Sequence, residues 1–187
     1  MNPDNELTGK ILIAMPDMGD PRFARSVVLI CAHSDEGAMG IVLNHPLHEL
    51  SFGGLLEMLG IAPAGPVPGL PLRQGGPVEP GRGFVLHSAR PVPQEDAMHV
   101  GSGLELTTTR DILIEIAEGN GPERAVLALG YAGWGPDQLD GEIRANGWLI
   151  GDMNPEYAFG PPDDVWRRAL AALGVDPLTL SGAAGRA

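Results

Sequence analysis

The stretch Ser26-Val27-Val28-Leu29-Ile30-Cys31-Ala32-His33 decides the fold. A strand points successive side chains to opposite faces. Here both faces are apolar, with Val27, Leu29 and Cys31 on one and Val28, Ile30 and Ala32 on the other. Polar residues 35–37 (DEG) follow, and residues 38–44 are again mostly apolar. The pattern predicts a hairpin whose first strand is buried on both sides.

Around this hairpin, short strand and helix patterns follow one another without regular alternation. Apolar runs predict further strands over residues 10–15, 72–74, 84–87, 104–107, 124–131 and 148–150. Apolar side chains at helical spacing predict helices over residues 52–59, around 112–117 and over 162–173, and one that begins at Pro136. Thr108 and Asp111 resemble a capping box at the start of the second helix. These features favour an α+β fold with a mixed, mostly antiparallel sheet.

We expect one domain over residues 1–187, with a loop over 61–70 and a frayed tail over 181–187. The 187 residues include 27 glycines and 18 prolines, and many of these lie in turns or where strands and helices are expected to end. With 43% hydrophobic residues, the chain has enough apolar material for a core.

The formal net charge is -12, and acidic residues exceed basic ones in every third of the sequence. Non-specific nucleic-acid binding draws its affinity from Lys and Arg on phosphates, so direct binding to nucleic acid is disfavoured. The longest apolar run, residues 27–32, is far shorter than the ~20 residues of a membrane span, and the first residues do not resemble a signal peptide. We expect a cytoplasmic protein without a membrane segment.

The common catalytic and cofactor signatures are missing, among them the phosphate loop, the dinucleotide fingerprint, the zinc protease motif and the serine nucleophile elbow. Cys31 and His33 lie two residues apart on one strand, an arrangement in which an imidazole lowers the pKa of a thiol. Because free cysteines are most often buried, the core interpretation of Cys31 comes first and a reactive thiol second. We assign no catalytic residue, no metal site and no cofactor.

Two glycine-rich segments admit a structural and a binding interpretation. Residues 73–78 (RQGGPV) fit a tight turn, which is favoured, or an anion-binding nest assisted by Arg73 or Arg82. Residues 130–139 (GYAGWGPDQL) predict that a buried strand runs into a glycine-rich turn and a helix start, a geometry suited to anions. Trp134 in this segment either packs back on the sheet or forms an exposed platform.

Several stretches, in matching order and spacing, resemble the YqgE/AlgH family of bacterial proteins. They are GKILIAMP (9–16) leading into DPRFARSVV (20–28), GAMGIVLN (37–44), GGPV (75–78) with RGFVLH (82–87), and LGYAGWG (129–135) with QL (138–139) and NGWL (146–149). The resemblance covers residues 7–175. It implies a branched sheet folded into a pseudo-barrel with flanking helices, and a cytosolic location. It implies no reaction, because the family's activity is undefined and its name reflects a proposed regulatory role.

Three functions are consistent with these residues. The first is a non-enzymatic regulatory or binding protein that takes another protein or a small ligand; its candidate binding residues are Arg25, Asn44, Arg82, Trp134 and Gln138. The second is an enzyme with an unrecognised site built from Cys31, His33 and His87. The third, a DNA-binding transcriptional regulator, is disfavoured by the net charge of -12.

Overall fold

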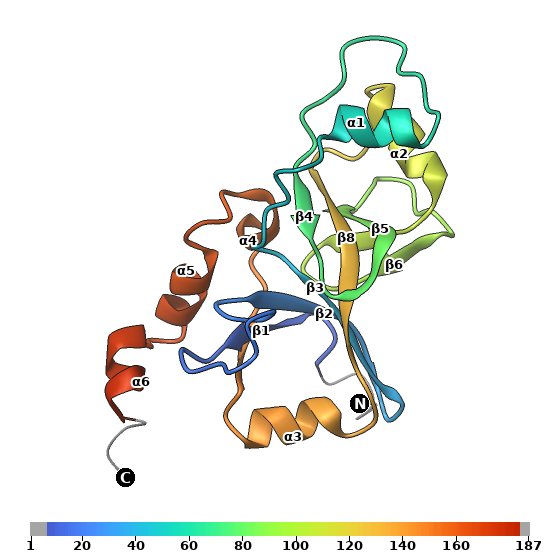
Figure 1. Cartoon of the computed structure of the whole chain (residues 1–187). Coiled ribbons are helices and arrows are strands. Elements are labelled where there is room, and N and C mark those ends of the chain that lie inside the picture. The colour runs from blue at the N-terminus through green and yellow to red at the C-terminus, as the bar shows by residue number, and fades with distance from the viewer. Residues whose placement is uncertain (1–6, 184–187) are drawn as a thin grey trace.

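A computed structural model describes residues 7–183, which contain one nine-stranded sheet curled into a half-barrel (Figure 1). The strands follow the order β6-β7-β5-β8-β3-β2-β1-β9, and every pair on this path is antiparallel. Their bounds are β1 Lys10–Ala14, β2 Val27–Ser34, β3 Gly37–Val42, β4 Leu72–Gln74, β5 Val78–Ser88, β6 Ala97–His99, β7 Leu104–Thr107, β8 Ala125–Trp134 and β9 Trp148–Asp152. With its helices, this architecture confirms the predicted α+β pseudo-barrel.

The sheet branches at β8, because two strands share one of its edges in succession. Strand β4 pairs in parallel with residues 127–129, and β3 pairs with residues 132–134. Strand β5 occupies the opposite edge, since Ala128 has a partner in both β4 and β5. The sheet is therefore mixed and mostly antiparallel, as expected.

The paired glycines after β4 allow this branch to form. The N–H of Gly75 donates to Leu129 O, and its carbonyl accepts from Val42 N, both at 2.8 Å. A Cβ on Gly75 or Gly76 would collide with the backbone of Gly130 or Tyr131, so only glycine permits the close approach. Because the Gly75 N–H is already used, this contact favours the structural interpretation of residues 73–78 over an anion-binding nest.

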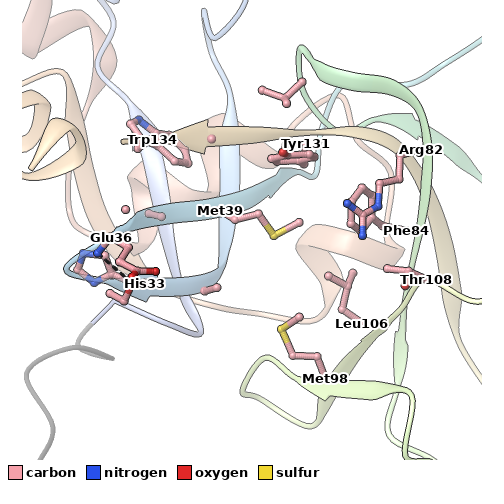
Figure 2. Close-up of a pocket in the computed structure, with 16 residues that line it drawn as sticks. His33, Glu36, Met39, Arg82, Phe84, Met98, Leu106, Thr108, Tyr131 and Trp134 are labelled. Carbon is pink, nitrogen blue, oxygen red and sulfur yellow. Dashed lines mark hydrogen bonds between the residues drawn. The ribbon is translucent and has the colours of Figure 1, made fainter. Parts of the chain in front are cut away.

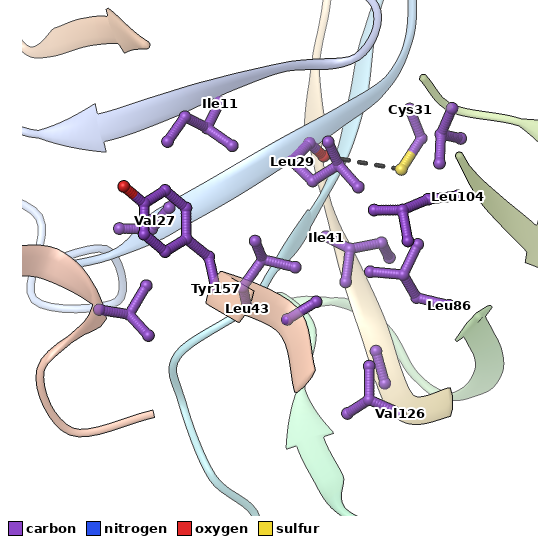
Figure 3. Packing of buried hydrophobic residues seen from close by; sticks show 14 of the residues in the cluster. Ile11, Val27, Leu29, Cys31, Ile41, Leu43, Leu86, Leu104, Val126 and Tyr157 are labelled. Carbon is purple, nitrogen blue, oxygen red and sulfur yellow. Dashed lines mark hydrogen bonds between the residues drawn. The ribbon is translucent and has the colours of Figure 1, made fainter. Parts of the chain in front are cut away.

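Three apolar clusters hold the fold together. The largest draws residues from β1, β2, β3, β5, β7 and β8, and therefore lies inside the curl of the sheet (Figure 3). Val27, Leu29 and Cys31 belong to this cluster, whereas Val28 and Ile30 belong to a second cluster on the opposite face. Both faces of β2 are thus buried, as predicted. Ala32 is exposed, because the β2–β3 register shifts between Ile30 and Ala32.

Helices cover the sheet on several sides; their bounds are α1 Phe52–Met58, α2 Arg110–Ala117, α3 Gln138–Arg144, α4 Glu156–Phe159, α5 Val165–Ala172 and α6 Pro177–Ala183. Helices α1 and α2 form the third cluster with Leu72, Val85 and Leu127, at the far end of the sheet from α3 (Figure 1). Helix α5 packs on the inner cluster through Trp166, whose indole N–H donates to Ala14 O at 2.8 Å. Within residues 7–183, no helix has the length and apolar character needed to cross a membrane.

The segment that contains Trp134 differs from the prediction. Strand β8 does not end at Tyr131 but continues to Trp134, which pairs with Ala38 of β3. Helix α3 begins at Gln138 rather than at Pro136, after Asp137 in the left-handed region with φ 60°. Pairing with β3 supplies hydrogen bonds to residues 132–134, and so this part of the chain stays extended despite Gly133.

The prediction of a capping box at the start of α2 is also wrong. The N-cap of α2 is Thr109 rather than Thr108, and it makes no side-chain capping bond. The Thr109 hydroxyl instead donates to Asp96 Oδ2 at 2.8 Å, because the chain just before β6 lies against the start of the helix.

Other differences concern the extent of elements. Strand β5 spans residues 78–88 rather than 84–87, α5 begins at Val165 rather than at residue 162, and β6, α4 and α6 were not expected. The loop over residues 61–70 contains neither helix nor strand, as predicted. Helix α6 includes residues 181–183 of the expected tail, and residues 184–187 lie outside the described residues.

Candidate functional site

The five candidate binding residues occupy two separate places. Arg82 and Trp134 line a groove of about 840 Å³ at one end of the half-barrel. Arg25 and Asn44 line a smaller, polar cavity of about 470 Å³ beside the start of α5. The sequence suggested that these residues contribute to binding, and the fold does not bring them to one pocket. Gln138 lines neither cavity; its Oε1 accepts from Gly135 N at 3.0 Å and holds the turn before α3.

The groove has an apolar floor. The β2–β3 hairpin, β5, β6, β7 and β8 all contribute, and the floor residues are Met39, Phe84, Met98, Leu106 and Tyr131. Figure 2 shows the Met39 side chain between the Tyr131 ring and the side chain of Met98. Met39 and Tyr131 also pack against the inner cluster, so the groove is continuous with the core. Two flexible methionines suit a surface that adapts to its ligand.

Charged groups stand at opposite margins of this floor. The Arg82 guanidinium lies 5.2 Å from the ring centroid of Phe84, and its Nη1 is 3.4 Å from Glu79 Oε2. His33 and Glu36 lie at the other margin, at the end of the β2–β3 hairpin (Figure 2). Nδ1 of His33 is buried and has no hydrogen-bond partner. The groove thus combines an apolar body with polar groups at two ends, a common design for small-molecule sites.

Trp134 packs as part of the sheet. Its side chain is only 6% exposed, its ring stacks on Phe23 at a centroid distance of 6.4 Å, and it meets Trp148 edge-on at 6.1 Å. The indole N–H groups of Trp134 and Trp148 both donate to Glu142 Oε1, at 3.3 and 3.1 Å. Of the two interpretations, this arrangement favours the one in which the ring packs back on the sheet.

Asn44 organises the polar cavity through its side-chain amide. Its Nδ2 donates to Arg25 O at 2.8 Å, and its Oδ1 accepts from Val27 N at 2.9 Å. The amide therefore fixes the backbone around Ser26, directly after Arg25, which adopts a left-handed conformation with φ 56°. The Arg25 guanidinium lies 5.5 Å from the ring centroid of Trp166. His45 lines the same cavity and meets Ser26 Oγ at 3.2 Å; burial lowers its pKa below 6.5.

Cys31, His33 and His87 have separate environments. Cys31 is 2% exposed inside the curl of the sheet, and its thiol donates to Leu29 O at 3.6 Å (Figure 3). Burial raises the pKa of this thiol to about 12, so it stays protonated at neutral pH. His33 lines the groove, while His87 is buried and bonds to Thr107 through Nε2 at 2.8 Å. A buried, protonated thiol does not suit nucleophilic chemistry.

Sequence reasoning missed one polar row across β5, β7 and β6, in which His87 and Glu105 are buried and His99 is exposed. Glu105 pairs across the sheet with His87 on one side and His99 on the other. Its Oε1 lies 3.5 Å from His99 Nδ1, and its buried Oε2 has no hydrogen-bond partner. The alternation of strand 104–107 places Glu105 on the face opposite Leu104 and Leu106, but nothing in the sequence shows that this face is covered. In residues 7–183, no group of three or more His, Cys, Asp and Glu is placed to hold a metal ion.

Comparisons with known proteins agree on one family. Residues 11–178 match the model of the DUF179 family, described as AlgH-like. The chain is 57% identical over 190 residues to a UPF0301 protein of Paracoccus denitrificans, with all of both chains covered. It is 51% identical to UPF0301 protein SPO0296 of Ruegeria pomeroyi, over 97% of this chain and 100% of that protein.

Two solved structures share the fold. The solution structure of AlgH from Pseudomonas aeruginosa superposes with a TM-score of 0.78 at 38% identity, and the match covers 94% of this chain and 93% of that one. The crystal structure of DIP2367 from Corynebacterium diphtheriae gives 0.74 at 22% identity, over 96% and 92%, which shows the fold alone. The family model and the close relatives extend over nearly the whole sequence, and the chain therefore belongs to the AlgH-like (UPF0301) family.

Proposed function

We propose that this protein is a non-enzymatic binding protein whose groove takes a small ligand with an apolar body and an acidic group. The observation that carries the proposal is the apolar floor of the 840 Å³ groove, with a guanidinium at one margin. The volume falls within the roughly 300–1,000 Å³ of small-molecule pockets. Arg82 is the one permanent cation among the described residues of the lining. A guanidinium held over an aromatic ring suits a carboxylate or sulfonate.

The surroundings of Cys31 support a binding rather than a catalytic role. The thiol is buried and protonated, and burial also lowers the pKa of His87, a residue that lies outside the groove. A ligand in the groove therefore meets methionines, aromatic rings and one guanidinium, with no activated nucleophile beside it.

The fluorescent probe 1-anilinonaphthalene-8-sulfonate, which is apolar and carries one sulfonate, tests the groove directly. We expect saturable binding to the native protein. Met39→Gln is expected to weaken binding because it makes the floor polar, and Arg82→Gln because it removes the cation; each change costs roughly tenfold in affinity, or ~1.4 kcal/mol.

Two matched variants serve as controls. Met58 is 75% exposed on α1 and lies outside the groove, so Met58→Gln should bind the probe as the wild type does. Arg144→Gln removes a cation from the last turn of α3 and should also have no effect. Non-saturable probe binding, or equal affinity of Met39→Gln and Met58→Gln, would contradict the proposal.

A further inference from the structure

The second cavity, of about 470 Å³, is polar and lies on another part of the molecule. It is formed by the turn before β2, the turn after β3 and the segment that leads into α5. Arg25 and Arg167 both line it. In the described residues, neither guanidinium has a carboxylate within the 4.0 Å of an ion pair, although Asp163 and Asp164 line the same cavity.

Contacts with its neighbours hold both the backbone and the side chain of Arg25 in place. A non-glycine residue in the left-handed region costs about 1 kcal/mol, and Arg25 is held there with φ 56°. The Asn44 amide accepts from Val27 N and donates to the Arg25 carbonyl, which fixes the chain directly after Arg25, and the Trp166 ring lies 5.5 Å from the guanidinium. The backbone and the side chain of Arg25 are therefore arranged before any ligand arrives.

A buried arginine outside the cavity lining feels the charge of one of the two carboxylates. Arg73 is 6% exposed and donates to Leu43 O at 3.1 Å and to Leu72 O at 3.3 Å. Burial lowers the pKa of its guanidinium, and the negative charge of Asp163 opposes that shift. Asp163 therefore compensates a cation on the interior side. The cavity lining thus holds two guanidinium groups and two carboxylates, and the charge of Asp163 is partly offset by the buried Arg73.

We propose that this cavity is an anion site, in which Arg25 and Arg167 bind the phosphate or carboxylate group of a small metabolite. Guanidinium groups present paired N–H donors that match the oxygens of either anion. The site is independent of the groove, because the two cavities share no lining residue.

Inorganic phosphate and acetate, titrated separately at constant ionic strength against chloride, test the proposal by amide chemical shifts. We expect saturable shifts for residues 24–25, 44–45 and 163–167 with one or both anions, and the stronger response identifies the anion class. Arg25→Asn keeps a residue type that tolerates the left-handed region and removes the guanidinium. Binding should weaken at least ~tenfold in Arg25→Asn and in Arg167→Gln.

Arg168→Gln is the matched control, because Arg168 lies on the same helix but outside the cavity, over the ring of Tyr157 at 5.7 Å. It should bind the anion as the wild type does. Shifts that are linear in both anions, or an equal loss in Arg168→Gln and Arg167→Gln, would overturn the site in favour of general charge attraction. Met39→Gln should leave anion binding unchanged. The probe titration and the anion titration therefore test the groove and the anion site independently.

Discussion

At the scale of single residues, Asn44 shows how one amide links two turns that lie far apart in the sequence. It follows β3, yet its hydrogen bonds go to the backbone of Arg25, before β2, and of Val27, the first residue of β2. Val27 is fully buried, and its N–H donates to the Asn44 side chain, so removal of that side chain takes away this buried hydrogen bond. An unsatisfied buried donor costs about 1–3 kcal/mol.

Asn44→Ala should therefore lower the free energy of unfolding by about 1–3 kcal/mol in urea titrations. Asn154→Ala is the matched control, because Asn154 Oδ1 accepts from Glu156 N at an exposed turn, where water replaces the lost bond. The control should lose much less stability. Equal losses in the two variants would mean that the Asn44 hydrogen bonds contribute no more to stability than those of an exposed turn.

Cys31 gives a second residue-scale prediction. With a pKa of about 12 and 2% exposure, its thiol should react with a disulfide probe at neutral pH only when the chain unfolds. The measurement compares the labelling rate in buffer with the rate in denaturant. Rapid labelling of the native protein would restore Cys31 as a candidate nucleophile.

At the scale of elements, the branch at β8 depends on how closely β4 can approach it. The first half of the β8 edge carries β4 and the second half carries β3, and the change occurs beside Gly75 and Gly76. Regular strand pairing alone does not require two adjacent glycines at this point. The approach of the two backbones supplies that reason.

Gly76→Ala should destabilise the protein by about 1–3 kcal/mol or more, because the added methyl group overlaps the Tyr131 backbone, which cannot move away without breaking β8. Gly81→Ala is the control, since a Cβ there meets nothing within 4 Å. Thermal unfolding of the two variants gives the comparison. A melting temperature for Gly76→Ala equal to that of Gly81→Ala would show that the branch tolerates a side chain.

At the scale of the whole molecule, the half-buried His45 and the buried His87 connect stability with pH. Burial lowers the pKa of both His45 and His87 below 6.5. Between the folded and unfolded pKa values the unfolded chain binds more protons, so stability rises with pH in that window. The contribution is complete above pH 6.5 and is lost as pH falls below it.

We expect the urea midpoint to fall between about pH 7.5 and about pH 5.5, a range above the titration of most carboxylates. Replacement of both histidines by glutamine should flatten this dependence, whatever its effect at high pH. An unchanged slope in the double variant would assign the pH dependence to other groups.

Much of the fold follows from local pattern. The two-faced burial of residues 27–31 and the hairpin with β3 are both present. Local pattern failed where long-range pairing decided the outcome: residues 132–134 were expected in a turn, but pairing with β3 keeps them in the strand. Thr109 likewise bonds to Asp96 rather than capping its own helix.

The candidate sites were less predictable than the fold. Arg25 and Asn44 do share a cavity, and Arg82 and Trp134 share another, but no local signal separates the two pairs. The floor of the groove, with Met39 and Met98, comes from strands more than fifty residues apart and carries no motif. Such a surface exists only after the sheet has curled.

By itself, the sequence determined the family, the fold class and most strands, because side-chain alternation and turn chemistry act between near neighbours. Only the tertiary structure decided which polar groups meet, which strand branches and where the two cavities lie. Those outcomes depend on contacts such as that of Trp166 with Ala14, 152 residues apart. Contacts of this kind form when the curled sheet and α5 bury their apolar surface together, and the residues between them do not encode them.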